Sequence, residues 1–337
     1  MAYRITLIPG DGIGPEVVEA TQKILAATPV EIYWETHHAG LEIARLTGTP
    51  LPTSVIDAVR KNRVALKGPV MTPIGGGFRS VNVTLRQTLD LYANVRPVRS
   101  LPGVEPRFGD VNLVIVRENT EGLYAGLELM ILPGVAQSIK LTTEKGSTRI
   151  AEFAFRYARQ NKRRRVTFVH KANIMKISDG LALDCTRRVA TSFPDVELAE
   201  MIVDAAAMTM VRDPNRLDTL VTENLYGDIL SDLGAGLVGG LGIVPGANIG
   251  SEAAVFEAVH GSAPDIAGKG FANPTALAQS AVMMLRHLGE AVAADRIERA
   301  LTEVYRRGEV RTRDLGGGTA STGEFTAAVI AEMGRQG

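Results

Sequence analysis

The stretch YRITLIPGDGIGPEVVEATQKILAA (residues 3–27) contains an apolar run, a glycine-rich break and a helical pattern in direct succession. YRITLI (3–8) predicts a buried strand, and Pro15 stands in a first-turn position, where a helix tolerates proline. Further short β-branched apolar runs lie at 64–68, 111–116, 166–170 and 217–222. Helical patterns lie at 52–62, 79–91, 146–160, 178–193, 226–241, 274–307 and 323–333. Strands that alternate with helices predict an α/β fold with a largely parallel sheet.

The break after the first strand contains Gly10, Gly12 and Gly14, which invites comparison with a dinucleotide-binding fingerprint. The spacing is G-x-G-x-G, whereas the fingerprint is G-x-G-x-x-G. The acidic residue expected about 20 positions later is ambiguous, because Glu31 and Glu35 both qualify. A tight strand-to-helix turn is therefore the favoured interpretation.

Composition limits the classes of partner. The chain has 337 residues, enough for about two domains. Its 37 Lys and Arg balance 37 Asp and Glu, which argues against nucleic acid or an anionic membrane as the main partner. A single cysteine, Cys185, fits a reducing compartment, and we expect a cytoplasmic protein without a signal peptide.

Three segments need a separate interpretation. The uncharged run 233–251 contains seven glycines and a proline, and we expect a buried helix followed by a turn. KRRR (162–165) follows a helical pattern and predicts a solvated turn rather than a binding patch. ILPGVAQSIKL (131–141) is β-rich without an obvious partner, which suggests an arm or hairpin.

A group of polar and cationic residues begins in GGGFRSVNVTLRQ (75–87). Three glycines precede Ser80, a predicted helix N-cap, and a helix start preceded by glycines suits an anion. Asn82 and Arg86 fall at i, i+4, Arg96 follows in YANVRP, and Arg117 ends the strand pattern of VNLVIVRENTEG. Convergent guanidinium groups suit a substrate with several carboxylates, although each arginine alone could form an ordinary surface pair.

Tyr124 and Lys171 are the candidates for proton transfer. A tyrosine or lysine with a shifted pKa can carry protons in catalysis. Taken alone, the favoured interpretation is a packed aromatic residue for Tyr124 and a surface lysine for Lys171.

Three aspartates lie in apolar surroundings. Asp228 and Asp232 are four residues apart in NLYGDILSDL (224–233), so they share one helix face, and Asp204 follows another apolar run. Carboxylates in such surroundings need a cation, and oxygen ligands alone suit Mg²⁺ or Mn²⁺. Spacing alone leaves open the alternative that Asp228 and Asp232 merely solubilise a helix start.

These segments together resemble the β-decarboxylating dehydrogenases, the isocitrate and isopropylmalate dehydrogenase family. The resemblance rests on GDGIGPEV, RSVNVTLRQTLDLYANVRP, VRENTEGLYAG, VHKANIMKISDG, NLYGDILSDL, HGSAPDIAGKG and ANPTA, and it extends from Ile5 to about Phe325. It implies a two-domain α/β fold with a non-Rossmann cofactor site. The large domain is expected at 1–91 and 240–337. The small domain, 92–239, is expected to carry a clasp arm near 122–143 that helps to form a homodimer.

The resemblance also implies roles for the candidate residues. Ser80, Asn82, Arg86, Arg96 and Arg117 would hold the substrate carboxylates. Asp228 and Asp232, with Asp204 from the second subunit, would bind Mg²⁺ or Mn²⁺. Lys171, also from the second subunit, would help to deprotonate the substrate hydroxyl, and Tyr124 would help to protonate the enol left by decarboxylation.

Substrate and cofactor preferences follow from the same resemblance. Isopropylmalate enzymes place apolar side chains at the start of the 79–91 helix, where this chain has Ser80 and Asn82, so isocitrate and NAD-linked oxidative decarboxylation are expected. Homoisocitrate dehydrogenases share LDLYANVRP, but their helix start lacks the S-x-N pair. Homoisocitrate and 3-isopropylmalate remain the alternative substrates. A regulatory, non-catalytic subunit is the alternative from another class.

The expected cofactor contacts lie in one loop and one following residue. The resemblance assigns adenosine binding to His260, Gly261, Ser262 and Ala263, and an adenine contact to Asn273. Asp265 and Ile266 stand where NADP-dependent relatives carry lysine and tyrosine. An aspartate there accepts a hydrogen bond from the ribose and repels a 2′-phosphate, so NAD is expected.

Overall fold

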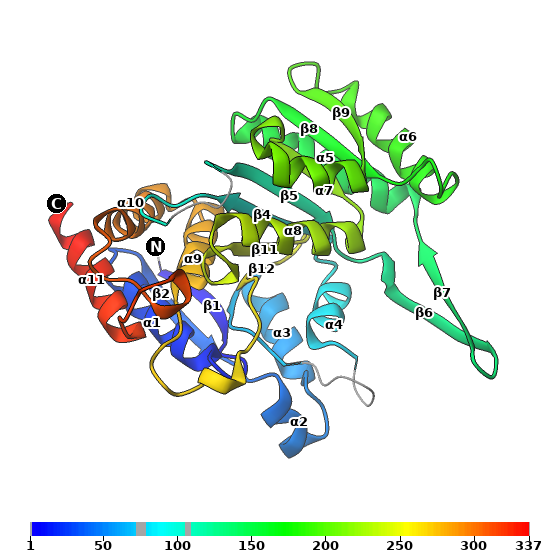
Figure 1. Ribbon diagram of the computed structural model, residues 1–337. Coiled ribbons are helices and arrows are strands. Elements are labelled where there is room, and N and C mark those ends of the chain that lie inside the picture. Colours follow the sequence, from blue (N-terminus) through cyan, green and yellow to red (C-terminus); the bar gives the residue numbers. More distant parts are fainter. Residues whose placement is uncertain (1, 72–78, 105–108, 337) are drawn as a thin grey trace.

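The protein is built around one ten-stranded mixed sheet (Figure 1). The computed structural model describes residues 2–71, 79–104 and 109–336. The strands follow the order β2-β1-β3-β12-β11-β4-β5-β10-β8-β9. Their bounds are β1 Ala2–Ile8, β2 Glu31–Thr36, β3 Val64–Lys67, β4 Ala93–Arg99, β5 Asn112–Glu118, β8 Arg165–His170, β9 Glu197–Ile202, β10 Thr219–Thr222, β11 Pro245–Ile249 and β12 Ala254–Ala258.

The pairing is parallel in both outer parts of the sheet and antiparallel in its middle. Strands β2, β1, β3 and β12 run parallel, as do β5, β10, β8 and β9. The pairs β12–β11, β11–β4 and β4–β5 are antiparallel. The sequence predicted the parallel parts, but the antiparallel centre joins two oppositely directed halves and was not anticipated.

Helices cover both halves of the sheet (Figure 1). Their bounds are α1 Gly14–Ala26, α2 Leu41–Thr47, α3 Thr53–Asn62, α4 Val81–Thr88, α5 Glu144–Gln160, α6 Ser178–Ala190, α7 Val203–Arg212, α8 Asn224–Val238, α9 Thr275–His287, α10 Ala291–Arg307 and α11 Thr322–Arg335. Helices α1, α9, α10 and α11 pack near the first strands, whereas α5, α6, α7 and α8 accompany β5, β8, β9 and β10. Both chain ends therefore belong to one lobe.

The glycine-rich break after β1 is a tight turn. Gly10 and Gly12 have φ angles of 79° and 60°. A Cβ on Gly10 would lie 2.0 Å from the carbonyl oxygen of Pro69, and a Cβ on Gly12 would lie 2.0 Å from that of Ser262. The glycines are thus required by left-handed backbone and by close backbone contact.

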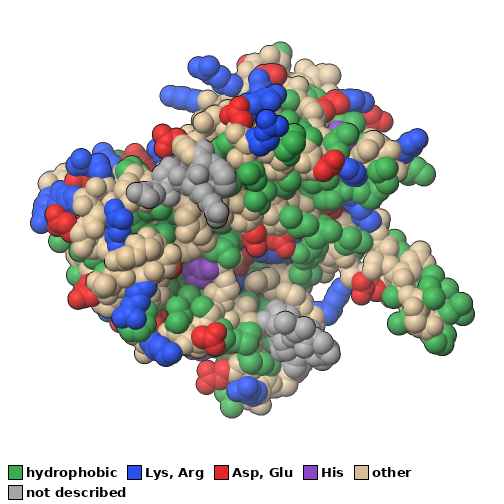
Figure 2. Space-filling view, viewed as in Figure 1, with side chains coloured by type: hydrophobic (Ala, Val, Ile, Leu, Met, Phe, Trp, Pro, Cys, Tyr) green, Lys and Arg blue, Asp and Glu red, His purple; other side chains and the backbone are tan. Residues whose placement is uncertain are grey.

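The predicted arm is a two-stranded hairpin, β6 (Gly122–Leu132) and β7 (Val135–Leu141), that projects from the second lobe (Figure 1). Its exposed side chains are strongly apolar, and Figure 2 shows them gathered over the tip. They include Leu127, Leu129, Met130, Ile131 and Leu132. An isolated hairpin is marginal in water, so this exposed surface suits burial against another chain.

The predicted helices are present, but some ends differ, the predicted stretch 274–307 divides into α9 and α10, and α2 and α7 were not predicted. Helix α8 ends at Val238, earlier than the predicted 241, because Gly239 and Gly240 adopt φ near 120°. The rest of the uncharged run contributes strand β11. No helix in the described ranges is long and apolar enough to cross a membrane. The predicted domain boundaries stay a prediction. Strand β11, from the expected large domain, pairs with β4, from the expected small domain, so one continuous sheet crosses the predicted boundary.

Candidate active site

A cavity of about 240 Å³ lies between the two lobes and brings together most of the predicted substrate residues. Strands supply Arg96 from β4, Arg117 from β5 and Glu257 from β12. The remaining predicted residues that line it are Ser80, Asn82, Arg86, Tyr124, Asp228, Asp232, His260 and Gly261. The cavity is therefore built by both halves of the sheet.

The start of α4 presents Ser80, Asn82 and Arg86 to this cavity. Ser80 is the N-cap, as predicted, and its Oγ accepts a hydrogen bond from the backbone N–H of Val83 at 3.4 Å. The three glycines expected to complete an anion site, residues 75–77, lie outside the described residues. Asn82 and Arg86 lie one turn apart, so one helix face carries both.

Arg96 and Arg117 are almost completely buried. Arg117 donates to Oδ1 of Asn224 from Nε at 3.1 Å and from Nη2 at 2.7 Å, and it also pairs with Asp228. Arg96 lies 3.4 Å from both Asp228 and Asp232 and also donates to Ser231. Burial, together with repulsion from Arg96 and Arg86, lowers the pKa of Arg117 to about 10. The guanidinium groups remain charged at neutral pH and favour anions in the cavity.

Asp228 and Asp232 lie on one face of α8, as the four-residue spacing predicted. Burial acts to raise the pKa of Asp228, but Arg117, Arg96 and the Tyr124 hydroxyl outweigh it and lower the pKa. The pKa of Asp232 is raised by burial and by the neighbouring Asp228, which Arg96 only partly offsets. Two carboxylates with this mutual repulsion, one of them partly exposed, have the oxygen-donor chemistry that suits a hard divalent cation.

Tyr124, near the base of the arm, points its hydroxyl at Oδ2 of Asp228, to which it donates a hydrogen bond. Its ring also lies 5.0 Å from the guanidinium carbon of Arg117. Burial first, and then Asp228, raise the pKa of Tyr124. The phenol therefore keeps its proton at neutral pH and can donate it.

Lys171 and Asp204 do not line the cavity of their own chain. They form an ion pair with each other, and Asp204 is well exposed at the start of α7. The Lys171 hydrogen bond is the main cause of the lowered pKa of Asp204. Across the described ranges, no three His, Cys, Asp or Glu side chains are grouped closely enough to hold a metal ion. A single chain thus does not assemble the three predicted aspartates.

Sequence reasoning missed a buried polar network beneath the cavity. The carboxylate of Glu257 lies 2.6 Å from Nζ of Lys67 and 2.9 Å from Nη2 of Arg86, and it accepts a hydrogen bond from Nδ2 of Asn248 at 2.7 Å. Asn248 in turn accepts from Asn94 at 2.8 Å. The available signal was a charged residue inside an apolar strand pattern, as in VALKG and AVFEA. A charge at such a position is buried and needs a partner.

The predicted cofactor loop begins directly after β12. His260 and Gly261 line the cavity, and burial lowers the pKa of His260 so that the imidazole is neutral. Ser262 is buried, and its carbonyl accepts from the N–H of Ile13 at 2.8 Å, so the loop packs on the glycine turn. Ala263 adopts a left-handed φ of 37°, and the following Asp265 and Ile266 are exposed.

Asn273 lies beyond the loop, next to the start of α9. Its side chain donates to Asp314 at 3.0 Å and accepts from the N–H of Thr275 at 3.0 Å. These contacts hold the side chain within the chain itself.

The cavity also contains polar atoms whose hydrogen-bonding capacity is unused. Within the described part of the chain, Asn82 Oδ1, Arg86 Nε, Arg96 Nε and His260 Nε2 are buried without a hydrogen-bond partner. Buried polar atoms rarely stay unpaired in a complete site. Their convergence fits a polar, multiply charged ligand that supplies the missing partners.

Comparison with known proteins agrees with this geometry. Residues 4–329 match the family described as isocitrate/isopropylmalate dehydrogenase. The chain is 52% identical over 334 residues to the alpha chain of a probable mitochondrial isocitrate dehydrogenase (NAD) of Drosophila melanogaster, covering 98% of this chain and 87% of the relative. It is 50% identical over 331 residues to a regulatory chain of the mitochondrial isocitrate dehydrogenase (NAD) of Dictyostelium discoideum, covering 98% and 92%.

Two further similarities bear on substrate and fold. The chloroplastic 3-isopropylmalate dehydrogenase of Solanum tuberosum is 52% identical over 308 residues, covering 91% of this chain and 86% of the relative. The crystal structure of isocitrate dehydrogenase from Methylococcus capsulatus superposes with a TM-score of 0.96 at 55% identity, covering 98% and 99% of the two chains. The chain therefore belongs to the isocitrate/isopropylmalate dehydrogenase family.

Proposed function

We propose that the protein catalyses the metal-dependent oxidative decarboxylation of D-isocitrate to 2-oxoglutarate and CO₂ with NAD as hydride acceptor. The observation that carries this proposal is the composition of the cavity. Three buried arginines, two polar side chains at the start of α4 and a pair of aspartates face the same space. Similarity to proteins named isocitrate dehydrogenase supports the same assignment.

The charge of the cavity favours a tricarboxylate bound with a divalent cation. Among the described residues, four cations line it, Lys67, Arg86, Arg96 and Arg117, against three carboxylates, Asp228, Asp232 and Glu257, so this lining has a net charge of +1. A substrate of charge −3 together with a cation of charge +2 makes the complex neutral. A dicarboxylate such as 3-isopropylmalate would leave one positive charge without a partner in a buried site, which is costly.

Polar side chains at the start of α4 also favour isocitrate. Asn82 is half-buried and lines the cavity at the start of α4. An apolar substituent placed there would leave this amide unpaired, whereas a carboxylate can accept from its Nδ2. Sites built for hydrogen bonding reject analogues that lack the polar group more strongly than apolar sites reject polar ones.

The chain's own residues divide the work. Arg86, Arg96 and Arg117 bind and orient the substrate carboxylates, and Tyr124 holds a proton for transfer to carbon. When bound, Mg²⁺ or Mn²⁺ at Asp228 and Asp232 supplies Lewis-acid stabilisation of negative charge, and NAD accepts the hydride. Lys171 is the proposed base for the substrate hydroxyl. Asp265 and Ile266 underlie the preference for NAD over NADP.

We infer that the catalytic unit is a homodimer with shared sites. Lys171 and Asp204 are exposed away from the cavity of their own chain, and the arm presents an apolar surface. Docking of a second copy would bury the arm and bring its Lys171 and Asp204 to the cavity. The cytoplasmic location stays a prediction.

A substrate panel tests the proposal. Purified protein is assayed with D-isocitrate, homoisocitrate, 3-isopropylmalate and D-malate, each with NAD or NADP in the presence of Mg²⁺. The proposal expects the highest kcat/KM for D-isocitrate with NAD. A higher kcat/KM for homoisocitrate or for 3-isopropylmalate would reassign the substrate, while the assignment of the fold would stand.

The alternative from another class is a regulatory, non-catalytic chain, which the family includes. The presence of Tyr124, Lys171, Asp204, Asp228 and Asp232 argues for a catalytic chain. If the purified chain is inactive on every substrate by itself but gains activity with a second, different chain, the regulatory alternative is favoured.

A further inference from the structure

A second and larger cavity, of about 880 Å³, lies on the opposite face of the central strands from the candidate active site. Successive side chains of a strand point to opposite faces of a sheet. On β4, Arg96 lines the candidate active site, while Val95 and Pro97 line the second cavity. On β12, Glu257 lines the candidate active site, while Phe256 lines the second cavity. The same strands therefore carry both cavities.

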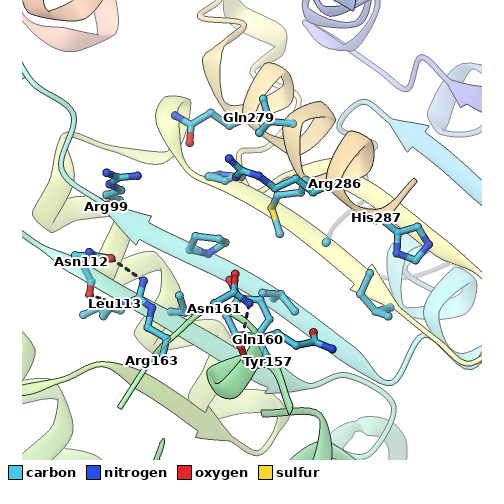
Figure 3. A pocket seen from close by; sticks show the side chains of 18 of the residues that line it. Arg99, Asn112, Leu113, Tyr157, Gln160, Asn161, Arg163, Gln279, Arg286 and His287 are labelled. Atoms are coloured by element: carbon cyan, nitrogen blue, oxygen red, sulfur yellow. Dashed lines mark hydrogen bonds between the residues drawn. The ribbon is translucent and has the colours of Figure 1, made fainter. Parts of the chain in front are cut away.

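The floor of this second cavity, here called the rear pocket, is apolar. It is formed by side chains of the central strands and of α9, with aromatic residues of α5 at one side (Figure 3). The apolar and aromatic lining residues are Val95, Pro97, Leu113, Val114, Phe153, Tyr157, Ile243, Pro245, Ala247, Ile249, Phe256, Val282 and Met283. Most of these side chains are already buried, and the partly exposed ones, which an apolar or aromatic group could cover, are Pro97, Phe153, Tyr157, Ile249 and Met283.

The rim of the rear pocket is cationic. Five basic residues line it, namely Arg99, Lys162, Arg163, Arg164 and Arg286, against two acidic ones, Asp218 and Glu298. Three of the basic residues belong to KRRR (162–165), whose sequence predicted only a solvated turn. The described part of the lining therefore has a net charge of +3, which Asp295, 2.8 Å from Arg286 and outside the lining, lowers to +2.

The acidic residues neutralise only part of this charge. Arg163 lies 2.9 Å from Asp218, and Arg286 lies 2.5 Å from Glu298, which Arg99 also approaches at 3.4 Å. Arg163 and Arg286 come from different lobes, yet both counteract the rise that burial causes in the pKa of Tyr157. Their charges thus converge on the same wall of the pocket.

We propose that the rear pocket binds an organic anion that combines an apolar, aromatic-sized body with an acidic group. The volume falls in the range of roughly 300–1,000 Å³ that is usual for small-molecule sites, which favour junctions between lobes. A small polar tricarboxylate would leave the apolar floor uncovered, and a purely apolar ligand would leave the cationic rim without a partner. The proposal does not depend on the substrate of the other cavity.

The probe chosen for the test is 8-anilinonaphthalene-1-sulfonate, which has an aromatic body and one sulfonate. Its binding to the full-length protein is followed by fluorescence titration. We expect saturable binding at one site per chain. N-phenyl-1-naphthylamine, which has a similar aromatic body without the sulfonate, should bind more weakly by about tenfold or more, because it makes no charge-assisted contact.

Variants place the binding in the pocket. Arg99→Gln combined with Arg286→Gln should weaken binding of the sulfonate by about tenfold or more. Gln279→Trp, which adds bulk from α9 into the pocket, should do the same without changing charge. Arg156→Gln combined with Arg188→Gln removes two exposed charges from α5 and α6 outside the pocket and should leave binding unchanged. Circular dichroism and the thermal midpoint confirm that each variant is folded.

Each outcome decides the proposal. Equal affinity of the wild type and the Arg99→Gln/Arg286→Gln variant would overturn it, and would place the probe elsewhere, for example on the apolar arm. Equal weakening in the Arg156→Gln/Arg188→Gln control would show a general effect of charge and would also overturn it. Binding of the sulfonate that does not saturate would also overturn the proposal. The same holds if N-phenyl-1-naphthylamine binds as tightly as the sulfonate.

Discussion

Glu257 offers the sharpest test of the electrostatics beneath the candidate active site. We expect Glu257→Gln to lower the free energy of unfolding by about 3 kcal/mol. The side chains of Glu257, Lys67 and Arg86 are 8%, 2% and 10% exposed, so water screens their charges little. Removing the carboxylate raises the charge of this buried trio from +1 to +2.

The magnitude follows from the contacts that glutamine can keep. Oε1 of residue 257 can still accept from Arg86 and Asn248, at 2.9 Å and 2.7 Å in the wild type. The new Nε2, however, would face the Lys67 ammonium, which lies 2.6 Å from the present Oε2. Breaking a buried pair costs about 3–5 kcal/mol, and the retained hydrogen bonds favour the lower end of this range.

Urea denaturation followed by circular dichroism, at a fixed protein concentration, measures this change. The matched control is Glu252→Gln in the turn before β12. Glu252 is 82% exposed and lies 3.9 Å from Arg63, so its replacement should change the free energy by no more than about 0.5 kcal/mol.

A double-mutant cycle with Lys67→Met isolates the pair. Because the methionine removes one of the two buried cations, the double variant should be less destabilised than the sum of the single variants by about 1–3 kcal/mol. A Glu257→Gln variant as stable as the Glu252→Gln control, with no coupling to Lys67, would refute the reasoning. KM for isocitrate should also rise, because a neutral amide holds Arg86 less firmly than the carboxylate does.

Three further predictions concern the shared site, the cofactor and the glycine turn. Lys171→Met and Asp228→Asn should each be inactive alone, and Asp228→Asn should also weaken Mg²⁺ binding by more than about tenfold. Co-expression of the two variants should restore about a quarter of wild-type activity. The reason is that random pairing makes about half of the dimers hybrids, and each hybrid has one intact site out of two. Hybrids without activity in that assay would place Lys171 and Asp228 in the same chain's site. Asp265→Lys combined with Ile266→Tyr should shift the kcat/KM ratio toward NADP, and an unchanged ratio in steady-state kinetics would remove this loop from cofactor selection. Gly12→Ala should lower the free energy of unfolding, measured with heat or urea, by more than about 2 kcal/mol, because its Cβ would meet the Ser262 carbonyl. The control Gly48→Ala has a similar positive φ but open space around the new Cβ, so it should cost about 1 kcal/mol. Equal losses in the two variants would contradict the contact between Gly12 and Ser262.

Much of the site could be predicted because its signals are local. Asp228 and Asp232 share a helix face by their spacing, and Ser80 caps α4 because its side chain lies three residues before the N–H that it accepts from. An arm or hairpin was expected at 131–141 because this β-rich segment has no obvious partner, and the structure shows a hairpin there that begins at Gly122. In each case the controlling interaction spans only a few residues, so the pattern along the chain contains it.

Other features could not be predicted because residues far apart in the chain decide them. The pattern does not state that β11 pairs with β4, since either strand could satisfy its hydrogen bonds with another neighbour. The same is true of the partner of Glu257, which is 190 residues from Lys67 in the sequence and 2.6 Å away in the fold. A buried charge was detectable in the sequence, but its counter-charge was not.

The sequence by itself determined the α/β class, the family and most of the residue types that face the candidate active site, but it did not predict strands β2, β4, β9, β11 and β12 or helices α2 and α7. Only the tertiary structure decided that Glu257 pairs with Lys67, and that Arg163 and Arg286 both line a rear pocket. The physical reason is that periodicity records which face of an element is buried. Which two elements close on each other depends on sheet order and lobe packing, which are set by contacts across the whole chain.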